Sequence, residues 1–317
     1  MSYSYLSAID MGTNSFRLIV ARVNEDGTFK IIDKKKELIR LASHEGKGLS
    51  IITDDEIKVA IKALKNFKRV ADFYNAPVKA IATSAVREAK NKHEFIAKVK
   101  EKTGIDVEVI DGHHEAKLIF LGVQYAISLK NKRAVCFDIG GGSTEFICAE
   151  NNRHIYAESI KIGAVRLTKR FFPEFIIDED SIHKCDKYVE EHIKINKNIK
   201  TNGKYDIAVG SSGTILATAS LIYFIKNHKE KKTIHGMKIS RENLNDAAEL
   251  VFSKKTMEER LKIKGLEKKR ADIMPAGLII LRKIFQLYNL KCMTVSENAL
   301  RTGIIIEMLK KHPEFKT

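Results

Sequence analysis

Two stretches of this 317-residue chain combine an aspartate, glycines and a serine at the same spacing. The first is Asp10-x-Gly12-x-x-Ser15, and the second, Asp138-x-Gly140-x-x-Ser143, follows it after 128 residues. Glycine lets backbone N–H groups turn inward towards a ligand, and a carboxylate at a strand end can hold a cation directly or through water. One such stretch is read equally well as a glycine-rich hairpin. The recurrence instead indicates a duplicated domain, with two facing loops that form a cleft for a metal-bound polyphosphate group.

A third anion-binding turn is predicted where strand 207–210 runs into the sequence Ser211-Ser-Gly-Thr214 and then a helix over 215–225. A helix N-terminus presents N–H groups that its own backbone does not use. Backbone N–H groups are therefore candidates for binding successive phosphates in three places. The candidate residues are Gly12, Thr13, Asn14 and Ser15 in the first loop, Gly140, Gly141, Gly142 and Ser143 in the second, and Ser212, Gly213 and Thr214 in the third.

Phosphoryl transfer also needs charge neutralisation and an oriented water molecule. Asp138, together with Asp10, is a candidate for holding Mg²⁺ through water. Arg87 follows a predicted strand and is a candidate for stabilising charge on the transferred group. Glu145 has two alternatives, a ligand to the metal or its water and a solvated strand residue. His113 and His114 are candidates for metal ligands, but adjacent side chains diverge and no third ligand stands at a suitable spacing, so they are interpreted as loop histidines.

The composition restricts the classes of protein that fit. The net charge of +16 predicts attraction to polyanions, with a lysine-rich composition bias as the alternative. Specific nucleic-acid binding is not indicated, because the sequence has no basic strand with interleaved aromatic residues. No apolar run approaches the roughly 20 residues that span a bilayer, and the N-terminal residues do not resemble a signal peptide. The four scattered cysteines are interpreted as reduced thiols, which predicts a cytoplasmic protein.

The elements that must position these residues follow an α/β pattern. Strands are predicted on both sides of each aspartate loop, and Thr53-Asp-Asp-Glu56 predicts a capping box for the helix that follows. Asn91 with Glu94 predicts a second helix N-cap. The polar segment 128–132 separates a predicted N-terminal domain, 1–128, from a C-terminal domain, 129–317. The last predicted helix, 298–310, could pack back on the first domain.

Four ordered motifs resemble the exopolyphosphatase/guanosine pentaphosphate phosphohydrolase (Ppx/GppA) family, within the actin/hexokinase/Hsp70 ATPase-fold superfamily. They are Asp10-Met-Gly-Thr-Asn-Ser-Phe-Arg17, Ala82-Thr-Ser-Ala-Val-Arg-Glu-Ala-Lys-Asn91, Asp138-Ile-Gly-Gly-Gly-Ser-Thr-Glu145 and Gly210-Ser-Ser-Gly-Thr-Ile215. The resemblance extends to Ser296-Glu-Asn-Ala-Leu-Arg-Thr-Gly303. It implies two duplicated ribonuclease H-like domains with an interdomain active-site cleft, in the short two-domain form of the family. It also places Arg17 with the phosphate-binding residues.

The resemblance implies Mg²⁺-dependent release of the terminal phosphate from inorganic polyphosphate or from guanosine pentaphosphate, an alarmone of the stringent response. It implies that Glu115 is the general base. Asp111 and His114 depart from the family's usual Ser-Gly-x-Glu-Glu-Ala pattern around this glutamate. Asp138, Glu145 and Asp10 are the metal candidates.

Two other functions stay open. The superfamily includes kinases, so a polyphosphate:ADP phosphotransferase is one alternative, and a non-catalytic polyphosphate or alarmone sensor is another. The Asp111 and His114 departures favour the sensor, whereas retention of Asp138 and Glu115 favours the hydrolase. The sequence does not rank the two substrates, and a homodimer is one option for the oligomeric state.

Overall fold

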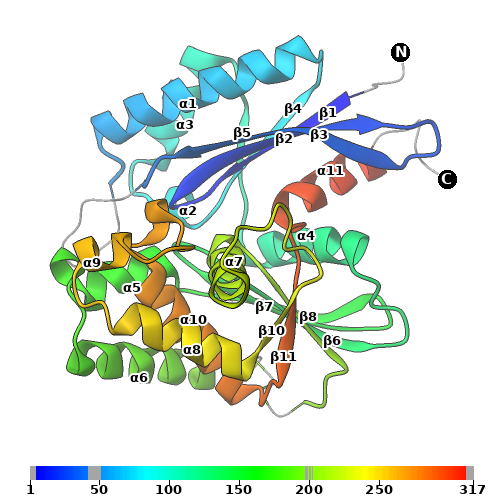
Figure 1. Cartoon of the computed structure of the whole chain (residues 1–317). Helices are drawn as coiled ribbons and strands as arrows, with labels where there is room; N and C mark the ends of the chain where they lie inside the picture. The colour runs from blue at the N-terminus through cyan, green and yellow to red at the C-terminus, as the bar shows by residue number, and fades with distance from the viewer. Residues whose placement is uncertain (1–4, 42–50, 197–198, 200, 202, 312–317) are drawn as a thin grey trace. The chain divides into compact units, whose positions relative to one another are not determined.

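The computed structural model describes residues 5–41, 51–196, 199, 201 and 203–311. The chain divides into two units (Figure 1), residues 1–122 with 300–317 and residues 123–299. The predicted boundary lies between 128 and 129, with the last helix counted in the second domain but able to pack back on the first. The first four residues, on which the signal-peptide prediction partly depends, lie outside the described residues. No helix in the described part of the chain combines the length and hydrophobicity needed to cross a membrane.

A five-stranded mixed sheet forms the centre of the first unit, in the order β3-β2-β1-β4-β5. The strands are β1 (Tyr5–Met11), β2 (Ser15–Val23), β3 (Phe29–Leu38), β4 (Val78–Ala82) and β5 (Val107–Val109). β1, β2 and β3 form an antiparallel meander, whereas β4 and β5 run parallel to β1. The C-terminal ends of β1, β4 and β5 therefore meet at one edge, where the polar motifs follow.

Helices cover both faces of this sheet (Figure 1). They are α1 (Asp54–Phe73), α2 (Ser84–Glu88), α3 (Lys92–Thr103), α4 (Gly112–Ala126) and α11 (Leu300–Lys311). α1 and α3 pack together on one face, and α11 packs against β1 and β2 on the other. The predicted capping box of α1 is confirmed, because Thr53 and Glu56 bond each other's backbone N–H. Asn91 stands at the N-cap of α3, but its side chain bonds the backbone of Ile52 instead of capping the helix.

The second unit repeats the sheet of the first. Its order is β10-β11-β9-β6-β7-β8, in which β6, β7 and β8 form an antiparallel meander and β9 and β11 continue parallel to β6. The strands are β6 (Arg133–Ile139), β7 (Thr144–Glu150), β8 (Arg153–Ile160), β9 (Ile207–Ser211), β10 (Lys238–Ser240) and β11 (Cys292–Val295). Only the antiparallel edge strand β10 has no counterpart among the described strands of the first unit. The predicted fold class, duplicated ribonuclease H-like domains of the actin-like ATPase type, is confirmed.

Helices also build the core of the second unit. They are α5 (Ala164–Phe171), α6 (Glu179–Ile195), α7 (Gly213–Asn227), α8 (Arg241–Phe252), α9 (Met257–Leu261) and α10 (Met274–Leu287), with short 3₁₀ turns at Pro173–Phe175 and Lys268–Arg270. Phe137 packs edge-on against Phe146 and Tyr288, with ring centroids 5.7 and 4.9 Å apart. α10 approaches α7 so closely that a Cβ on Gly277 would lie 2.4 Å from Thr214. This contact fixes the start of α7, where the third predicted phosphate turn lies.

Candidate active site

The two aspartates of the repeated motif occupy equivalent places. Asp10 is the second-last residue of β1 and pairs across the sheet with Arg17, whereas Asp138 is the second-last residue of β6 and pairs with Glu145. The two units therefore share the same strand register around the repeated motif. The residue paired with the aspartate differs in charge between the units. It is a cation, Arg17, in the first unit and a carboxylate, Glu145, in the second.

The first loop is tied down through its backbone. The Asn14 carbonyl accepts hydrogen bonds from the N–H groups of Ile39 (3.2 Å) and Arg40 (3.1 Å). Arg17 Nε donates to Ser15 Oγ at 3.4 Å. The side-chain amide nitrogen of Asn14, Nδ2, is buried and has no hydrogen-bond partner among the described residues. A buried donor in that state requires an explanation, and a ligand oxygen would supply one.

Asp10 sits in an environment that opposes its ionisation. Burial raises the pKa of Asp10, and the nearby positive charges of Arg17 and Arg301 lower it, with a net result above the usual value. Arg301 belongs to α11, so the last helix contributes charge to the first loop. Burial therefore disfavours the charged carboxylate form of Asp10, which is the form that a cation would bind.

Glu115 lies in the first turn of α4, and its side chain is buried, with 6% of the residue exposed. Arg87, in the short helix α2 after β4, donates from Nη1 to Glu115 Oε2 at 2.9 Å. The same Nη1 donates to the carbonyl of Ile110 at 3.0 Å. The structure thus brings together two of the three predicted catalytic side chains, from elements that follow neighbouring parallel strands.

The residues that depart from the family pattern have clear structural roles. Asp111 Oδ1 accepts from the backbone N–H of His114 at 2.7 Å, and this hydrogen bond lowers the pKa of Asp111. Asp111 therefore acts at the N-terminal end of α4 as a capping carboxylate. The Nε2 atom of His114 lies 2.7 Å from Glu307 Oε1 in α11. His114 is thus helical and bound to a neighbouring helix, unlike the loop histidine that was predicted.

The glycine loop of the second unit packs against the N-terminal end of α5. The Gly140 carbonyl accepts from Ala164 N–H, and the Gly141 carbonyl accepts from the N–H groups of Val165 and Arg166. Arg166 Nε also donates to the Gly142 carbonyl at 2.7 Å. Because the carbonyls face α5, the peptide N–H groups of this loop are directed elsewhere. In the described part of the chain, no hydrogen bond engages the N–H of Gly141 or Gly142.

Close approach explains two glycines near this loop. A Cβ on Gly163, just before α5, would lie 2.4 Å from the Gly141 carbonyl oxygen, which no side chain could tolerate. A Cβ on Gly140 would lie 3.0 Å from the Ser143 carbonyl oxygen, and the Gly140 N–H donates to that same oxygen at 2.9 Å. The N–H of Gly140 is therefore used inside the loop, whereas the N–H groups of Gly141 and Gly142 donate to no acceptor among the described residues.

Serine hydroxyls hold the two carboxylates of the second unit. Ser211 Oγ donates to Asp138 Oδ2 at 2.6 Å, across the β6–β9 pair. Ser143 and Ser159 both donate to Glu145 Oε1, at 2.8 and 2.7 Å. Glu145 is only 1% exposed, so the alternative of a solvated strand residue does not hold. Hydrogen bonds of this kind fix the orientation of a carboxylate that must meet a cation or water.

The third turn has a strained backbone at its centre. Ser212 has φ +101° and ψ 165°, a region that non-glycine residues rarely adopt. Its side chain accepts from Ile215 N–H at 3.3 Å and so caps α7. The turn therefore lies at the N-terminus of a 15-residue helix, where N–H groups and the helix dipole favour an anion.

Carboxylate oxygens of the second unit are the kind of hard ligand that Mg²⁺ prefers. Within the described residues, no three His, Cys, Asp or Glu side chains converge as a ready-made metal site. Mg²⁺ usually takes one or two carboxylates and completes its shell with water and phosphate oxygens. Asp138 and Glu145, opposite each other across β6 and β7, offer such hard oxygen ligands and fit this pattern.

Several residues of the site were not found from the sequence. Ser211 and Ser159 reach the two carboxylates from other strands, and Glu307 reaches His114 from 193 positions away. Gly303 is a further example, because a Cβ there would lie 1.9 Å from the Leu118 carbonyl of α4. Each of these contacts forms within one unit and depends on the fold of that unit, although Ser211 and Gly303 do fall within motifs of the resemblance.

Comparison with known proteins gives a consistent result. The sequence profile of the Ppx/GppA phosphatase family matches residues 19–312. The chain is 33% identical over 313 residues to the bifunctional 3-dehydroquinate synthase/phosphatase of Fusobacterium nucleatum, covering 95% of this chain and 46% of that protein. The chain therefore spans about half the length of this curated relative.

Solved structures agree along almost the whole chain. An exopolyphosphatase from Cytophaga hutchinsonii is 32% identical, with a TM-score of 0.87 and coverage of 98% of this chain and 99% of the other. The Ppx/GppA family member from Aquifex aeolicus is 29% identical, with a TM-score of 0.80 and coverage of 97% and 99%.

Proposed function

Because this chain belongs to the Ppx/GppA phosphatase family, we propose that it is a hydrolase that releases the terminal phosphate from inorganic polyphosphate, from guanosine pentaphosphate, or from both. The observation that carries the proposal is the buried Glu115 carboxylate, held by Arg87 at 2.9 Å. A buried carboxylate beside a cation is a suitable base only when the cation has another anion to bind. The terminal phosphate of the substrate supplies that anion.

The proposed role of Arg87 follows from its hydrogen bonds. Its guanidinium is planar and has five N–H donors, and one of its terminal nitrogens already serves both Glu115 and the Ile110 carbonyl. The remaining donors suit a phosphate, which arginine binds with two parallel hydrogen bonds. Arg87 would then stabilise charge on the transferred phosphoryl group, while Glu115 orients a water molecule and takes its proton.

Mg²⁺ is proposed as the cofactor. When bound, it would neutralise phosphate oxygens and favour attack on the terminal phosphorus. Asp138, oriented by Ser211, would hold it, with Glu145 as a second ligand or a ligand to its water. The raised pKa of Asp10 gives this aspartate weaker support as a metal ligand.

Backbone N–H groups are proposed to bind the phosphate chain. Gly141 and Gly142 in one loop and the start of α7 after Ser212 present such groups, and the loop at Asn14 adds a buried amide. The net charge of +16 would attract the polyanion to the protein. We also propose a cytoplasmic location, because the cysteines are free thiols.

The test is phosphate release from long-chain polyphosphate and from guanosine pentaphosphate, measured side by side with Mg²⁺ and with a chelator. The proposal expects Mg²⁺-dependent release from at least one substrate. Binding without release from either would support a sensor instead. Formation of ATP from polyphosphate and ADP, faster than release of phosphate, would support the phosphotransferase alternative.

A further inference from the structure

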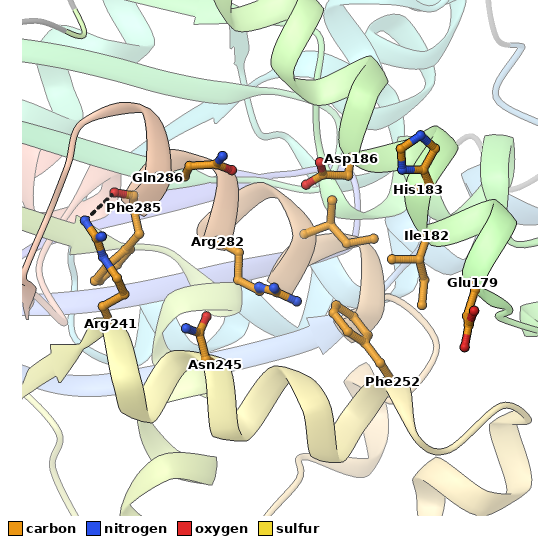
Figure 2. Close-up of a pocket in the computed structure, with 11 residues that line it drawn as sticks. Glu179, Ile182, His183, Asp186, Arg241, Asn245, Phe252, Arg282, Phe285 and Gln286 are labelled. Carbon is orange, nitrogen blue, oxygen red and sulfur yellow. Dashed lines mark hydrogen bonds between the residues drawn. The ribbon is translucent and has the colours of Figure 1, made fainter.

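A cavity of about 540 Å³ lies in the second unit, between helices α6, α8 and α10 (Figure 2). None of the predicted catalytic, metal or phosphate-binding residues lines it. The volume falls within the range of small-molecule sites in proteins, roughly 300–1,000 Å³. Its wall combines apolar side chains with a few polar groups. The apolar lining residues are Ile182, Phe252, Ile279 and Phe285.

Arg282 of α10 extends into the middle of this cavity, with Asn245 of α8 nearby (Figure 2). Its guanidinium carbon lies 5.7 Å from the centre of the Phe252 ring. Within the described residues, the side chain of Arg282 has no ion pair or hydrogen bond. An arginine held over an aromatic ring keeps its donors available for an anion.

The other charged groups of the cavity already have partners or lie at its edge. Arg241 donates to the carbonyls of Leu290 (3.0 Å) and Phe285 (3.4 Å) and to Asn289. Asp186 is paired at 2.7 Å with the buried Lys283. Glu179 belongs to the exposed first turn of α6. Arg282 is therefore the cation that a ligand would meet.

The charges also limit the ligand. Arg241 and Asp186 already have partners within the protein. Among the described residues of the wall, Arg282 is therefore the one available arginine and Glu179 the remaining carboxylate. This favours a singly charged anion over a phosphate dianion, because a second negative charge would have no cation to pair with. The apolar walls favour a compact hydrocarbon body. We propose that this cavity binds a small monocarboxylate with an aromatic or branched apolar body, whose carboxylate pairs with Arg282. This inference is independent of the phosphatase proposal.

Benzoate is the probe for calorimetric titration of the whole chain. Acetate supplies the charge without the body, benzyl alcohol supplies the body without the charge, and phenyl phosphate supplies a dianion. The proposal expects benzoate to bind more tightly than all three. Equal binding of benzyl alcohol, tighter binding of phenyl phosphate, or no binding of benzoate would overturn it.

The variant Arg282→Met should weaken benzoate binding by about tenfold or more, the loss expected when a charge-assisted pair is removed. The benzoate affinity of Arg282→Lys should lie between those of the unchanged protein and Arg282→Met, because lysine keeps the charge but not the two parallel donors. The matched control is Arg170→Met. Arg170 also lies over an aromatic ring in this unit, 4.2 Å from the centre of Tyr188, but outside the cavity. An equal loss in both methionine variants, each checked by its melting temperature, would contradict the assignment.

Discussion

Arg87 and Glu115 form an ion pair at 2.9 Å in which the carboxylate is almost entirely buried and the guanidinium is mostly buried, with 8% and 22% of the side chains exposed. The pair joins α2 to the start of α4, two elements that follow the parallel strands β4 and β5. It therefore links the stability of the first unit to the group that we propose as the catalytic base.

Replacing Glu115 with Gln should lower kcat by about 10²–10⁴ and change KM little, because a general base acts mainly in the transition state. The measurement is steady-state phosphate release on both candidate substrates. Glu108→Gln, in the neighbouring strand β5, is the matched control and should keep its activity. Near-normal turnover of Glu115→Gln would assign the base elsewhere.

Replacing Arg87 with Met should destabilise the protein by about 3–5 kcal/mol, because Glu115 would keep a buried charge without its partner. The double variant with Glu115→Gln should recover part of this loss. Chemical denaturation of the four proteins in the cycle measures the coupling. The more exposed pair Lys79–Glu108, with 31% and 43% of the side chains exposed, serves as the control, with an expected coupling of about 0.2–1 kcal/mol. Simple additivity at Arg87 and Glu115 would show that the ion pair contributes nothing.

Replacing Asp138 with Asn should abolish Mg²⁺-dependent turnover and leave the circular dichroism spectrum unchanged. Asparagine keeps the shape and still accepts the hydrogen bond from Ser211, but it removes the charge that attracts the cation. Activity is measured across a Mg²⁺ titration. Asp246→Asn, on the exposed side of α8, is the control. A titration curve like that of the unchanged protein would rule out the metal role.

Replacing Gly303 with Ala should destabilise the first unit by about 1–3 kcal/mol, because the new Cβ would lie 1.9 Å from the Leu118 carbonyl and would force α4 and α11 apart. Activity should also fall, since α4 carries Glu115. Melting temperature and turnover are the measurements. Lys310→Ala, on the exposed face of α11, should change neither. An unaltered Gly303→Ala protein would show that the two helices are not held at this distance.

Glu190 predicts a dependence of stability on pH. Hydrogen bonds from Lys194 and Lys283 lower the pKa of Glu190 from 4.5 to about 2. When folding lowers the pKa of a carboxylate, that carboxylate stabilises the folded state at pH values above its unfolded pKa. The stabilisation is lost as the pH falls through its folded pKa. Glu190→Gln should thus cost about 1–2 kcal/mol at neutral pH. The difference from the unchanged protein should shrink between pH 4.5 and about 2.

The control for this prediction is the adjacent exposed residue. Glu191→Gln should have almost no effect at any pH, because its side chain points to solvent. Free energies of unfolding at several pH values provide the comparison. A Glu190→Gln difference that stays constant from pH 7 to pH 2 would contradict the assigned cause.

Local sequence patterns were sufficient for the repeated loops and the capping box of α1, because both depend on residues within a few positions of each other. They were insufficient where a side chain finds a distant partner. Asn91 matches an N-cap by type, but its amide bonds Ile52 instead, 39 residues earlier. A tertiary contact of this kind replaces the local one without any change in the pattern.

The same reason explains what was missed around the proposed site. Ser211 meets Asp138 across 73 residues, and no spacing rule connects them until β6 and β9 are known to be neighbours. His114 was interpreted as a loop residue, whereas α4 already begins at Gly112, and the partner of His114, Glu307, lies 193 positions away. Residue types indicated the chemistry, whereas the hydrogen bonds that orient each group required the sheet order.

The opposite charges at Arg17 and Glu145 have a consequence for the ancestry of the chain. These residues occupy the same register position in the two sheets, each opposite an aspartate. After gene duplication, one copy came to carry a cation and the other an acid in this column. The two sheets therefore keep the same strand pairing but place opposite charges beside their aspartates, so the two halves of the chain are not electrostatically interchangeable.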